Sequence, residues 1–163
     1  MLKHKTKRRF FMVIWLILSL PVVIFFLVLL GNQANLSQAP GPVKRIKLFS
    51  TTNTAEINPE SYLPELRAPI VNLSPDELFD RLTTGIQTFG WEIVASDKAN
   101  HTIHLVVTTS LWKFKDDIRV TIFKHDNGSS LYAISQSRLG SGDLAANSHH
   151  LQMLLGLLPE ADQ

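Results

Sequence analysis

The chain of 163 residues has room for one domain with short accessory segments, and its 16 Lys and Arg against 14 Asp and Glu give a formal net charge of +2 at pH 7. Five of these cations lie in the first nine residues, so the remaining chain has 11 cations against 14 acids, a mildly acidic balance that argues against nucleic-acid binding. The chain contains no cysteine, which excludes disulfide bonds, thiolate nucleophiles and thiol-linked lipids.

A membrane-spanning segment is predicted directly after residues 1–9, which we expect to form a basic cytoplasmic flank. Phe10 to Leu30 is an uncharged run of 21 residues, and as a helix it would be about 32 Å long, close to the hydrocarbon thickness of a bilayer. The apolar part of a cleaved signal peptide usually has only about 7–15 residues. The length therefore favours an uncleaved single-pass helix in the lipid bilayer, and the basic flank places the following domain on the periplasmic or lumenal side.

Residues 31–49 are expected to form a flexible linker, because their first part is rich in Gly, Pro, Ser, Asn and Gln. The second part, residues 43–49 (VKRIKLF), mixes apolar residues with three cations. Two interpretations of this second part are open: contact with anionic headgroups beside the anchor, or an edge strand that begins the fold.

The folded domain is expected over residues 50–158, followed by a short tail at 159–163. Its first clear helix covers residues 74–90, because Ser74 followed by Pro75 and by Glu77 is typical of a helix start with a capping box. Apolar residues then recur at helical spacing, and Gly90 supplies the stop. This apolar helix face requires a sheet to cover it.

Four strands are predicted next, at residues 91–96, 102–110, 117–124 and 130–138, followed by a last helix from about residue 143 to 158. The fold class is therefore α+β: an N-terminal single transmembrane helix, then a helix, a four-stranded antiparallel sheet and a helix.

The turn between the third and fourth predicted strands contains Asn127 and Gly128, a strong hairpin signal. If these two residues form the turn, Asp117 falls opposite Arg138. If the loop has three residues and a bulge, Asp116 falls opposite Arg138 instead. In both registers a carboxylate of the Asp-Asp pair meets the guanidinium at the end of the sheet away from the turn.

Most of the polar residues capable of a specific role gather where this end of the sheet meets the start of the last helix. The expected cluster comprises Asp116, Asp117, Ser137, Arg138, Gly140, Asp143, Asn147 and His150. Three interpretations compete: a structural ion network, which we prefer; recognition of an anion or small ligand by Arg138 and the helix amides; and catalysis or metal binding through the carboxylates with His149 or His150. The last lacks a Ser-His-Asp order, a phosphate loop and a metal-ligand spacing.

One segment resembles a known family. The pattern Phe114-x-Asp116-Asp117, followed by Ser135-x-Ser137-Arg138-x-Gly140-x-x-Asp143-Leu144-x-x-Asn147, is similar to the domain of unknown function family number 1499 (DUF1499), and the likeness extends over roughly residues 51–158. The resemblance implies a mostly bacterial or plastid origin, sometimes a membrane segment, and no established activity. The family's usual cysteine near residue 53 is absent, and its usual basic pair after the Asn is His149-His150 here.

The expected function is that of a membrane-anchored, non-enzymatic binding or accessory domain at the membrane or envelope, with no metal or cofactor and with a membrane protein as a candidate partner. The alternative is an enzyme, or a binder of small ligands or anions, that uses the cluster of Asp116 or Asp117 with Arg138, Asp143 and Asn147. A concave pocket that contains Arg138 and one aspartate would favour this alternative.

Overall fold

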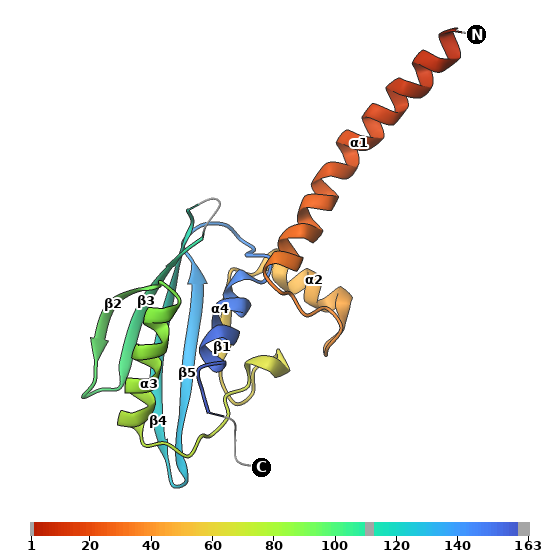
Figure 1. Cartoon of the computed structure of the whole chain (residues 1–163). Helices are drawn as coiled ribbons and strands as arrows, with labels where there is room; N and C mark the ends of the chain where they lie inside the picture. Colours follow the sequence, from red (N-terminus) through yellow and green to blue (C-terminus); the bar gives the residue numbers. More distant parts are fainter. Residues whose placement is uncertain (1, 110–112, 160–163) are drawn as a thin grey trace.

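The computed structural model describes residues 2–109 and 113–159 (Figure 1). Its elements are, in chain order, α1 (Leu2–Gly31), α2 (Pro42–Thr51), β1 (Thr54–Ile57), a short 3-10 helix η1 (Pro64–Leu66), α3 (Pro75–Thr88), β2 (Glu92–Asp97), β3 (Thr102–Thr108), β4 (Lys115–His125), β5 (Gly128–Ser137) and α4 (Ala146–Leu155). The α+β class is confirmed. Of the predicted tail, residues 160–163 lie outside the described residues.

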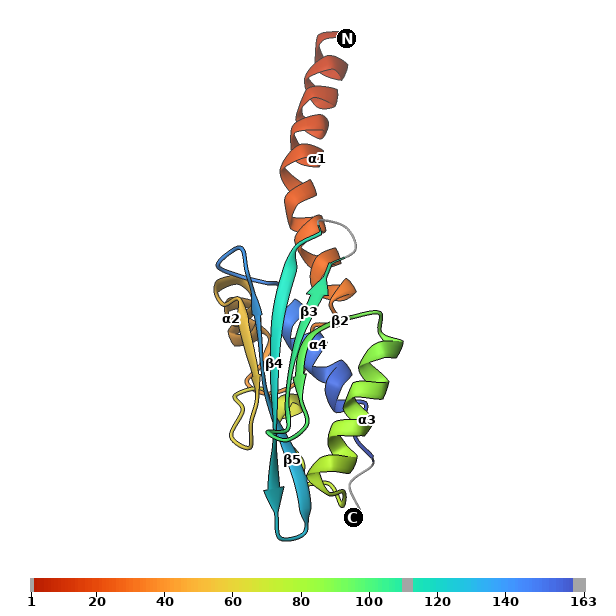
Figure 2. The ribbon, with the colours of Figure 1, turned by 90° about the vertical axis from the view of Figure 1, so that its left-hand side faces the viewer.

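Helix α1 projects away from the rest of the molecule in both ribbon views (Figures 1 and 2). Its segment Phe10–Gly31 is long and apolar enough to cross a membrane, and an N-terminal signal sequence would pass the same test. Most large apolar side chains of this segment are exposed.

The sheet has five antiparallel strands in the order β1-β5-β4-β3-β2, one more than the four predicted. Strands β2 to β5 form the expected meander, and β1 pairs with the free side of β5, where Ala55 faces Ser135. Alternate residues of β4 and β5 face α3 and α4, which lie on the same side of the sheet (Figure 2). The core lies between these two layers.

Helices α3 and α4 differ in how closely they follow the prediction. The predicted start of α3 is confirmed, because the Ser74 hydroxyl accepts the Glu77 amide and the Glu77 carboxylate accepts the Ser74 amide. Helix α4 begins at Ala146 and not near residue 143. Leu144 and Ala145 have φ values of 50° and 72°, so the chain turns in the left-handed region before the helix starts.

Both predicted hairpin registers are wrong. His125 pairs with Gly128, so Asp126 and Asn127 are the turn residues. Gly128 is instead the point where another segment approaches, since its φ is 135° and a Cβ atom there would lie 1.9 Å from the Val71 carbonyl oxygen. The segment before α3 thus crosses Gly128 closely and forms an isolated bridge between Val71 and Ser129. This tertiary contact lies beside the turn and is absent from local sequence patterns.

Residues 42–51, which include the second part of the expected linker and the candidate edge strand at 43–49, instead form helix α2. The Arg45 guanidinium is fully buried, forms two hydrogen bonds of 2.5 and 2.8 Å with the Glu65 carboxylate, and donates to the Gln38 and Ala39 carbonyls. Phe49 on the same helix is 3% exposed. The segment between α1 and β1 is therefore fixed to the domain by a buried ion pair and a core side chain.

Candidate functional site

The predicted cluster is divided between the two faces of the sheet. Asp116 and Asp117 are neighbours in β4, and side chains alternate along a strand. Asp116 points toward α4 and is 2% exposed, whereas Asp117 lies on the opposite face. The eight predicted residues therefore form an outer group and an inner group and do not converge on one site.

The outer group consists of Asp117, Arg138 and His104. The Arg138 Nε and Nη2 atoms donate to the two Asp117 carboxylate oxygens at 2.6 and 2.8 Å, and His104 Nε2 lies 3.0 Å from Asp117 Oδ1. Because Asp117 faces Gln136, the ion pair forms diagonally across the strands. The Arg138 hydrogen bonds hold the pKa of Asp117 well below its usual value, and the same contact raises the pKa of Arg138.

The inner group is centred on Asn147, whose side chain is fully buried at the start of α4. Its Oδ1 accepts from the Ser135 hydroxyl at 2.5 Å, and its Nδ2 donates to the Ser137 hydroxyl at 2.9 Å and to the Asn53 carbonyl at 2.8 Å. One amide thus joins α4 to β5 and to the segment before β1. Both polar atoms of Asn147 are used within the fold.

Asp143 shapes the turn before α4. Its carboxylate accepts the amides of Ala145 at 2.9 Å and Asn147 at 3.0 Å, so it supports the helix start from outside the helix. Burial raises the pKa of Asp143, and these amide hydrogen bonds oppose the rise. Gly140 occupies the left-handed region at φ 90°, and its carbonyl accepts from the Asn53 side chain at 2.8 Å.

His150 and Asp116 form the least satisfied part of the inner group. His150 Nδ1 lies 3.6 Å from Asp116 Oδ2, and both buried atoms lack a hydrogen-bond partner among the described residues. Burial raises the pKa of Asp116 above its usual value and lowers the pKa of His150 to about 4. Trp91 packs its ring edge to face with the imidazole, at 5.6 Å between centroids. This is an apolar setting that favours the neutral form of both groups.

Three residues that were not expected in the cluster belong to it in the structure: Ser135, Asn53 and His104. Ser135 was detectable, since it lies two residues before Ser137 and must share its strand face. Asn53 was not, because its partner Asn147 lies 94 positions away, and the contact of His104 with Asp117 depends on the register between β3 and β4. Among residues 2–109 and 113–159, no group of three or more His, Asp or Glu side chains is placed to hold a metal ion.

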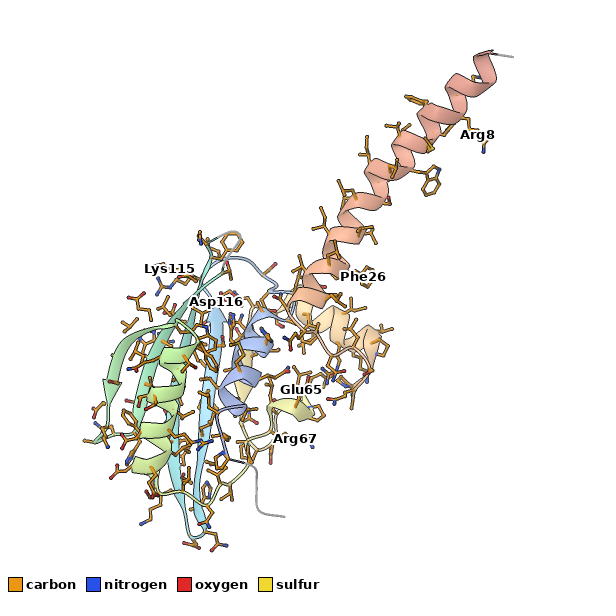
Figure 3. All side chains as sticks on the ribbon, in the orientation of Figure 1. Arg8, Phe26, Glu65, Arg67, Lys115 and Asp116 are labelled. Carbon is orange, nitrogen blue, oxygen red and sulfur yellow. The ribbon has the colours of Figure 1, made fainter. Side chains whose placement is uncertain are left out.

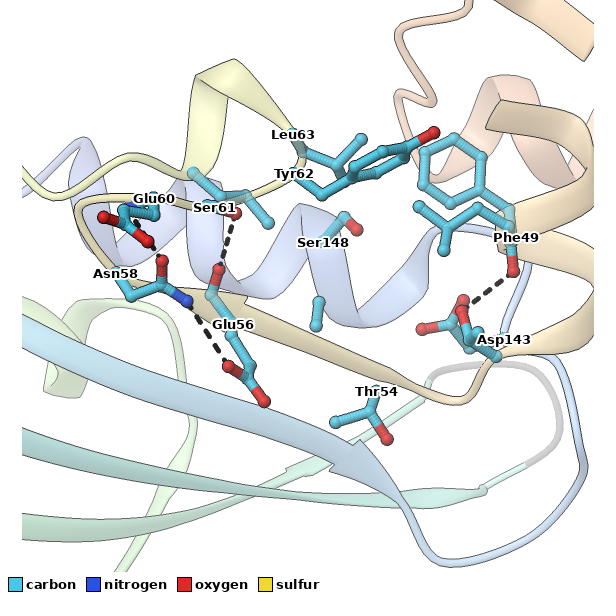
Figure 4. A pocket seen from close by; sticks show the side chains of 14 residues that line it. Phe49, Thr54, Glu56, Asn58, Glu60, Ser61, Tyr62, Leu63, Asp143 and Ser148 are labelled. Carbon is cyan, nitrogen blue, oxygen red and sulfur yellow. Dashed lines mark hydrogen bonds between the residues drawn. The ribbon is translucent and has the colours of Figure 1, made fainter. Parts of the chain in front are cut away.

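A cavity of about 270 Å³ lies beneath α2, bounded by β1, the segment before η1 and the start of α4 (Figure 4). Its lining combines apolar residues such as Phe49 and Leu63 with the exposed residues Glu56 and Glu60. Asp143 is the one predicted site residue that reaches it. The lining residues are Leu48, Phe49, Thr52, Thr54, Ala55, Glu56, Asn58, Glu60, Ser61, Tyr62, Leu63, Leu66, Asp143 and Ser148.

Comparisons with known proteins identify the family. No curated protein matches the chain. A solved structure entitled "Crystal structure of Ara h 8.0201" is similar over 64% of this chain and 96% of that chain, with 12% sequence identity and a TM-score of 0.41, a likeness too low to bear on function. The model of the family described as "Protein of unknown function (DUF1499)" matches residues 35–158, which include the whole sheet and both helices that cover it, and the chain therefore belongs to this family.

Proposed function

We propose that the chain is a single-pass membrane protein with a cytoplasmic N-terminus, and that its α+β domain acts on the periplasmic or lumenal side as a binding or accessory domain without catalytic activity. The apolar run and the acid-free basic residues before it support this topology. The inner and outer polar groups support a structural role, because Arg138 donates from Nε and Nη2 to Asp117 and Asn147 uses both of its side-chain polar atoms on neighbours in the fold.

The observation that carries the proposal is the packing of the end of α1 into the domain. Leu29 is 2% exposed and belongs to the same core as the sheet, with Phe25 packed beside it. The Asn32 side chain donates to the Leu144 carbonyl at 2.9 Å. A cleaved signal peptide would take Leu29 away and leave a cavity in the core, so this packing favours an uncleaved anchor.

The test is the fate of the intact chain in its membrane, followed through a tag at the C-terminus. We expect the full-length mass, retention in the membrane after alkaline carbonate extraction, and protease access to the tag only from the side opposite the cytoplasm. A shortened mass that lacks α1, or release by carbonate, would contradict the anchored form.

A second candidate function, small-ligand binding, is favoured by the cavity beneath α2. Replacing Leu48, which lines the cavity, with Trp would fill part of this space, whereas Thr51→Trp places the same ring on the exposed side of the same helix. If the cavity binds a ligand, Leu48→Trp abolishes complementation of a strain that lacks the protein, at unchanged thermal stability, and Thr51→Trp does not. Equal complementation by both variants would exclude this candidate.

A further inference from the structure

The end of the domain from which α1 projects is built from segments that lie far apart in the sequence. Both ribbon views show α2, the end of β3, the start of β4 and the connection from β5 to α4 at the level of the end of α1 (Figures 1 and 2). The β4–β5 hairpin lies at the opposite end of the sheet. In the view with side chains, Lys115 and Asp116 lie at the end nearest α1 (Figure 3).

Hydrogen bonds join these segments directly. Asn32, just after α1, donates to the carbonyl of Leu144, and the Leu144 amide donates to the Phe49 carbonyl of α2 at 2.9 Å. The Arg138 amide in turn donates to the Lys115 carbonyl at the start of β4, at 3.0 Å. The position of α1 therefore determines where all four segments lie relative to a membrane that α1 crosses.

Four of the segments at this end expose a large apolar side chain. Leu30 ends the apolar run of α1, Val43 is the second residue of α2, Phe114 precedes β4 and Leu139 follows β5. Their exposed fractions are 77% for Leu30, 80% for Val43, 48% for Phe114 and 68% for Leu139. Exposed apolar groups that gather around a membrane helix are typical of a surface that meets lipid.

The charges around these apolar residues are mostly positive. Lys44, Lys47, Lys113 and Lys115 are exposed on the same segments, and Glu92 at the start of β2 is an exposed acid toward this end. At the far end, exposed acids lie in the first turn of α3 (Asp76 and Glu77), at the end of β2 (Asp97) and in the hairpin turn (Asp126), together with Lys98 and Lys124. The mildly acidic domain is thus polarised, with its basic side toward α1.

We infer that this end forms a membrane-contact face that binds anionic phospholipid headgroups. We define the face by Leu30, Val43, Lys44, Lys47, Lys113, Phe114, Lys115 and Leu139. The inference rests on the proposed insertion of α1: apolar residues at the level of its last turns reach the interfacial region, and the lysines beside them meet lipid phosphates. In this arrangement the membrane-contact face lies directly on the bilayer surface, and no flexible linker separates the domain from the membrane.

The absence of native cysteine allows a direct test on the full chain in vesicles. Single variants Val43→Cys and Leu139→Cys carry an environment-sensitive fluorophore on the face, and Asn127→Cys carries it in the distant hairpin turn. In vesicles of phosphatidylcholine with phosphatidylglycerol, headgroup spin labels are expected to quench the first two probes at least fivefold more strongly than the third.

The contribution of charge is tested with Lys44→Gln/Lys47→Gln, for which the distant pair Lys98→Gln/Lys124→Gln is the matched control. Each lysine near an anionic surface contributes roughly fivefold to its attraction. The first pair is therefore expected to reduce quenching of the Val43 probe in phosphatidylglycerol vesicles, and the control pair is not.

The outcomes separate this inference from the proposed function. If the protein resists carbonate extraction but the Val43 and Leu139 probes behave like Asn127, the membrane-contact face is wrong and the anchor stands. If the protein is not retained in the membrane at all, the proposed function itself fails. Equal quenching in pure phosphatidylcholine, unaffected by Lys44→Gln/Lys47→Gln, would overturn the preference for anionic headgroups.

Discussion

Asp116 and Asp117 are neighbours in β4, but their pKa values shift in opposite directions because they lie on opposite faces of the sheet. Asp117 lies on the outer face, where the Arg138 guanidinium favours its ionised form and lowers its pKa. Asp116 lies on the inner face, where burial disfavours the ionised form and raises its pKa. From the sequence both residues were candidates for the pairing with Arg138, although strand alternation alone allows only one of them to share a face with the guanidinium.

Replacing Asp116 with Asn should stabilise the protein at neutral pH by about 1 kcal/mol, the size of a typical hydrogen bond. The change removes a buried charge, and the new amide can donate to His150 Nδ1, which lacks a partner among the described residues. Because the folded-state pKa of Asp116 is raised, the gain is present above that pKa and disappears as the pH falls and the wild-type carboxyl becomes protonated. The gain in the free energy of unfolding is measured by denaturant unfolding of the detergent-solubilised chain, followed by tryptophan fluorescence.

The neighbouring substitution Asp117→Asn is the control, and its effect should have the opposite sign. It removes the acceptor of Arg138 and lowers stability at neutral pH by up to about 1 kcal/mol, as for other partly exposed ion pairs. Equal effects of the two substitutions would contradict the division of the cluster between two faces.

His150 should make the protein sensitive to acid. Its folded-state pKa of about 4 lies below the ordinary value of 6.5, so between these values the unfolded chain binds a proton that the folded chain does not. Stability therefore rises with pH across this window, by up to about 3 kcal/mol. Asp116 and Asp143 offset part of this rise, because their raised pKa values favour protonation of the folded state.

Replacing His150 with Leu should flatten the stability profile between pH 4 and pH 6.5. The matched control is His125→Gln, which changes an exposed imidazole in β4 and should leave the slope unchanged. Unfolding midpoints at half-unit pH intervals give the comparison. A slope that persists in His150→Leu would show that the acid sensitivity arises elsewhere.

At the scale of elements, α2 is the piece that the sequence did not reveal. Residues 42–51 have three cations and little apolar periodicity, and Arg45 looks like a solvated charge. Its burial depends on Glu65, a residue 20 positions later, and on the carbonyls of the preceding loop. Sequence patterns are read within one segment, whereas the contacts that fix α2 are an ion pair with η1 and a core side chain, Phe49.

Replacing Arg45 with Met should release the connection between α1 and α2. The substitution leaves the Glu65 carboxylate and two carbonyls without their buried partner, which costs about 3–5 kcal/mol in comparable cases. Protease cleavage within residues 33–41 should become fast, together with a lower unfolding midpoint. Arg119→Met, at an exposed position of β4, is the control, and equal cleavage of both variants would exclude a specific role for Arg45.

At the scale of the whole molecule, the α+β class, helix α3 and the meander of β2 to β5 were predictable because their signals are local. Hydrophobic periodicity, caps and turn residues act over ten or twenty positions. The fifth strand was not predictable in this way, since β1 has only four residues and its partner β5 lies about 80 positions away. The residues of the candidate site could also be identified from the sequence. Their division between the two faces of the sheet could not, because it depends on the register between β4 and β5.

The packing of α1 predicts a fixed geometry between α1 and the α+β domain. Spin labels at Leu20→Cys and Val94→Cys, both exposed positions, should give a narrow distance distribution in lipid nanodiscs. Leu29→Ala removes the buried side chain that holds α1 and should broaden this distribution, whereas Leu30→Ala changes the adjacent exposed residue and should not. A broad distribution in the unsubstituted chain would contradict the fixed geometry.

The hydrogen bond from Asn32 to Leu144 spans 112 positions of the chain, and this separation has a consequence for biosynthesis. At usual elongation rates, the ribosome adds Leu144 on the order of ten seconds after it adds Asn32. In the proposed topology α1 can enter the bilayer during that time, while the edge of β1 has no partner until β5 is synthesised. In this topology the last part of the chain completes the fold after α1 has entered the bilayer, and a nascent chain that stops before β5 would expose the edge of β1 and the apolar side of α2 beside the membrane.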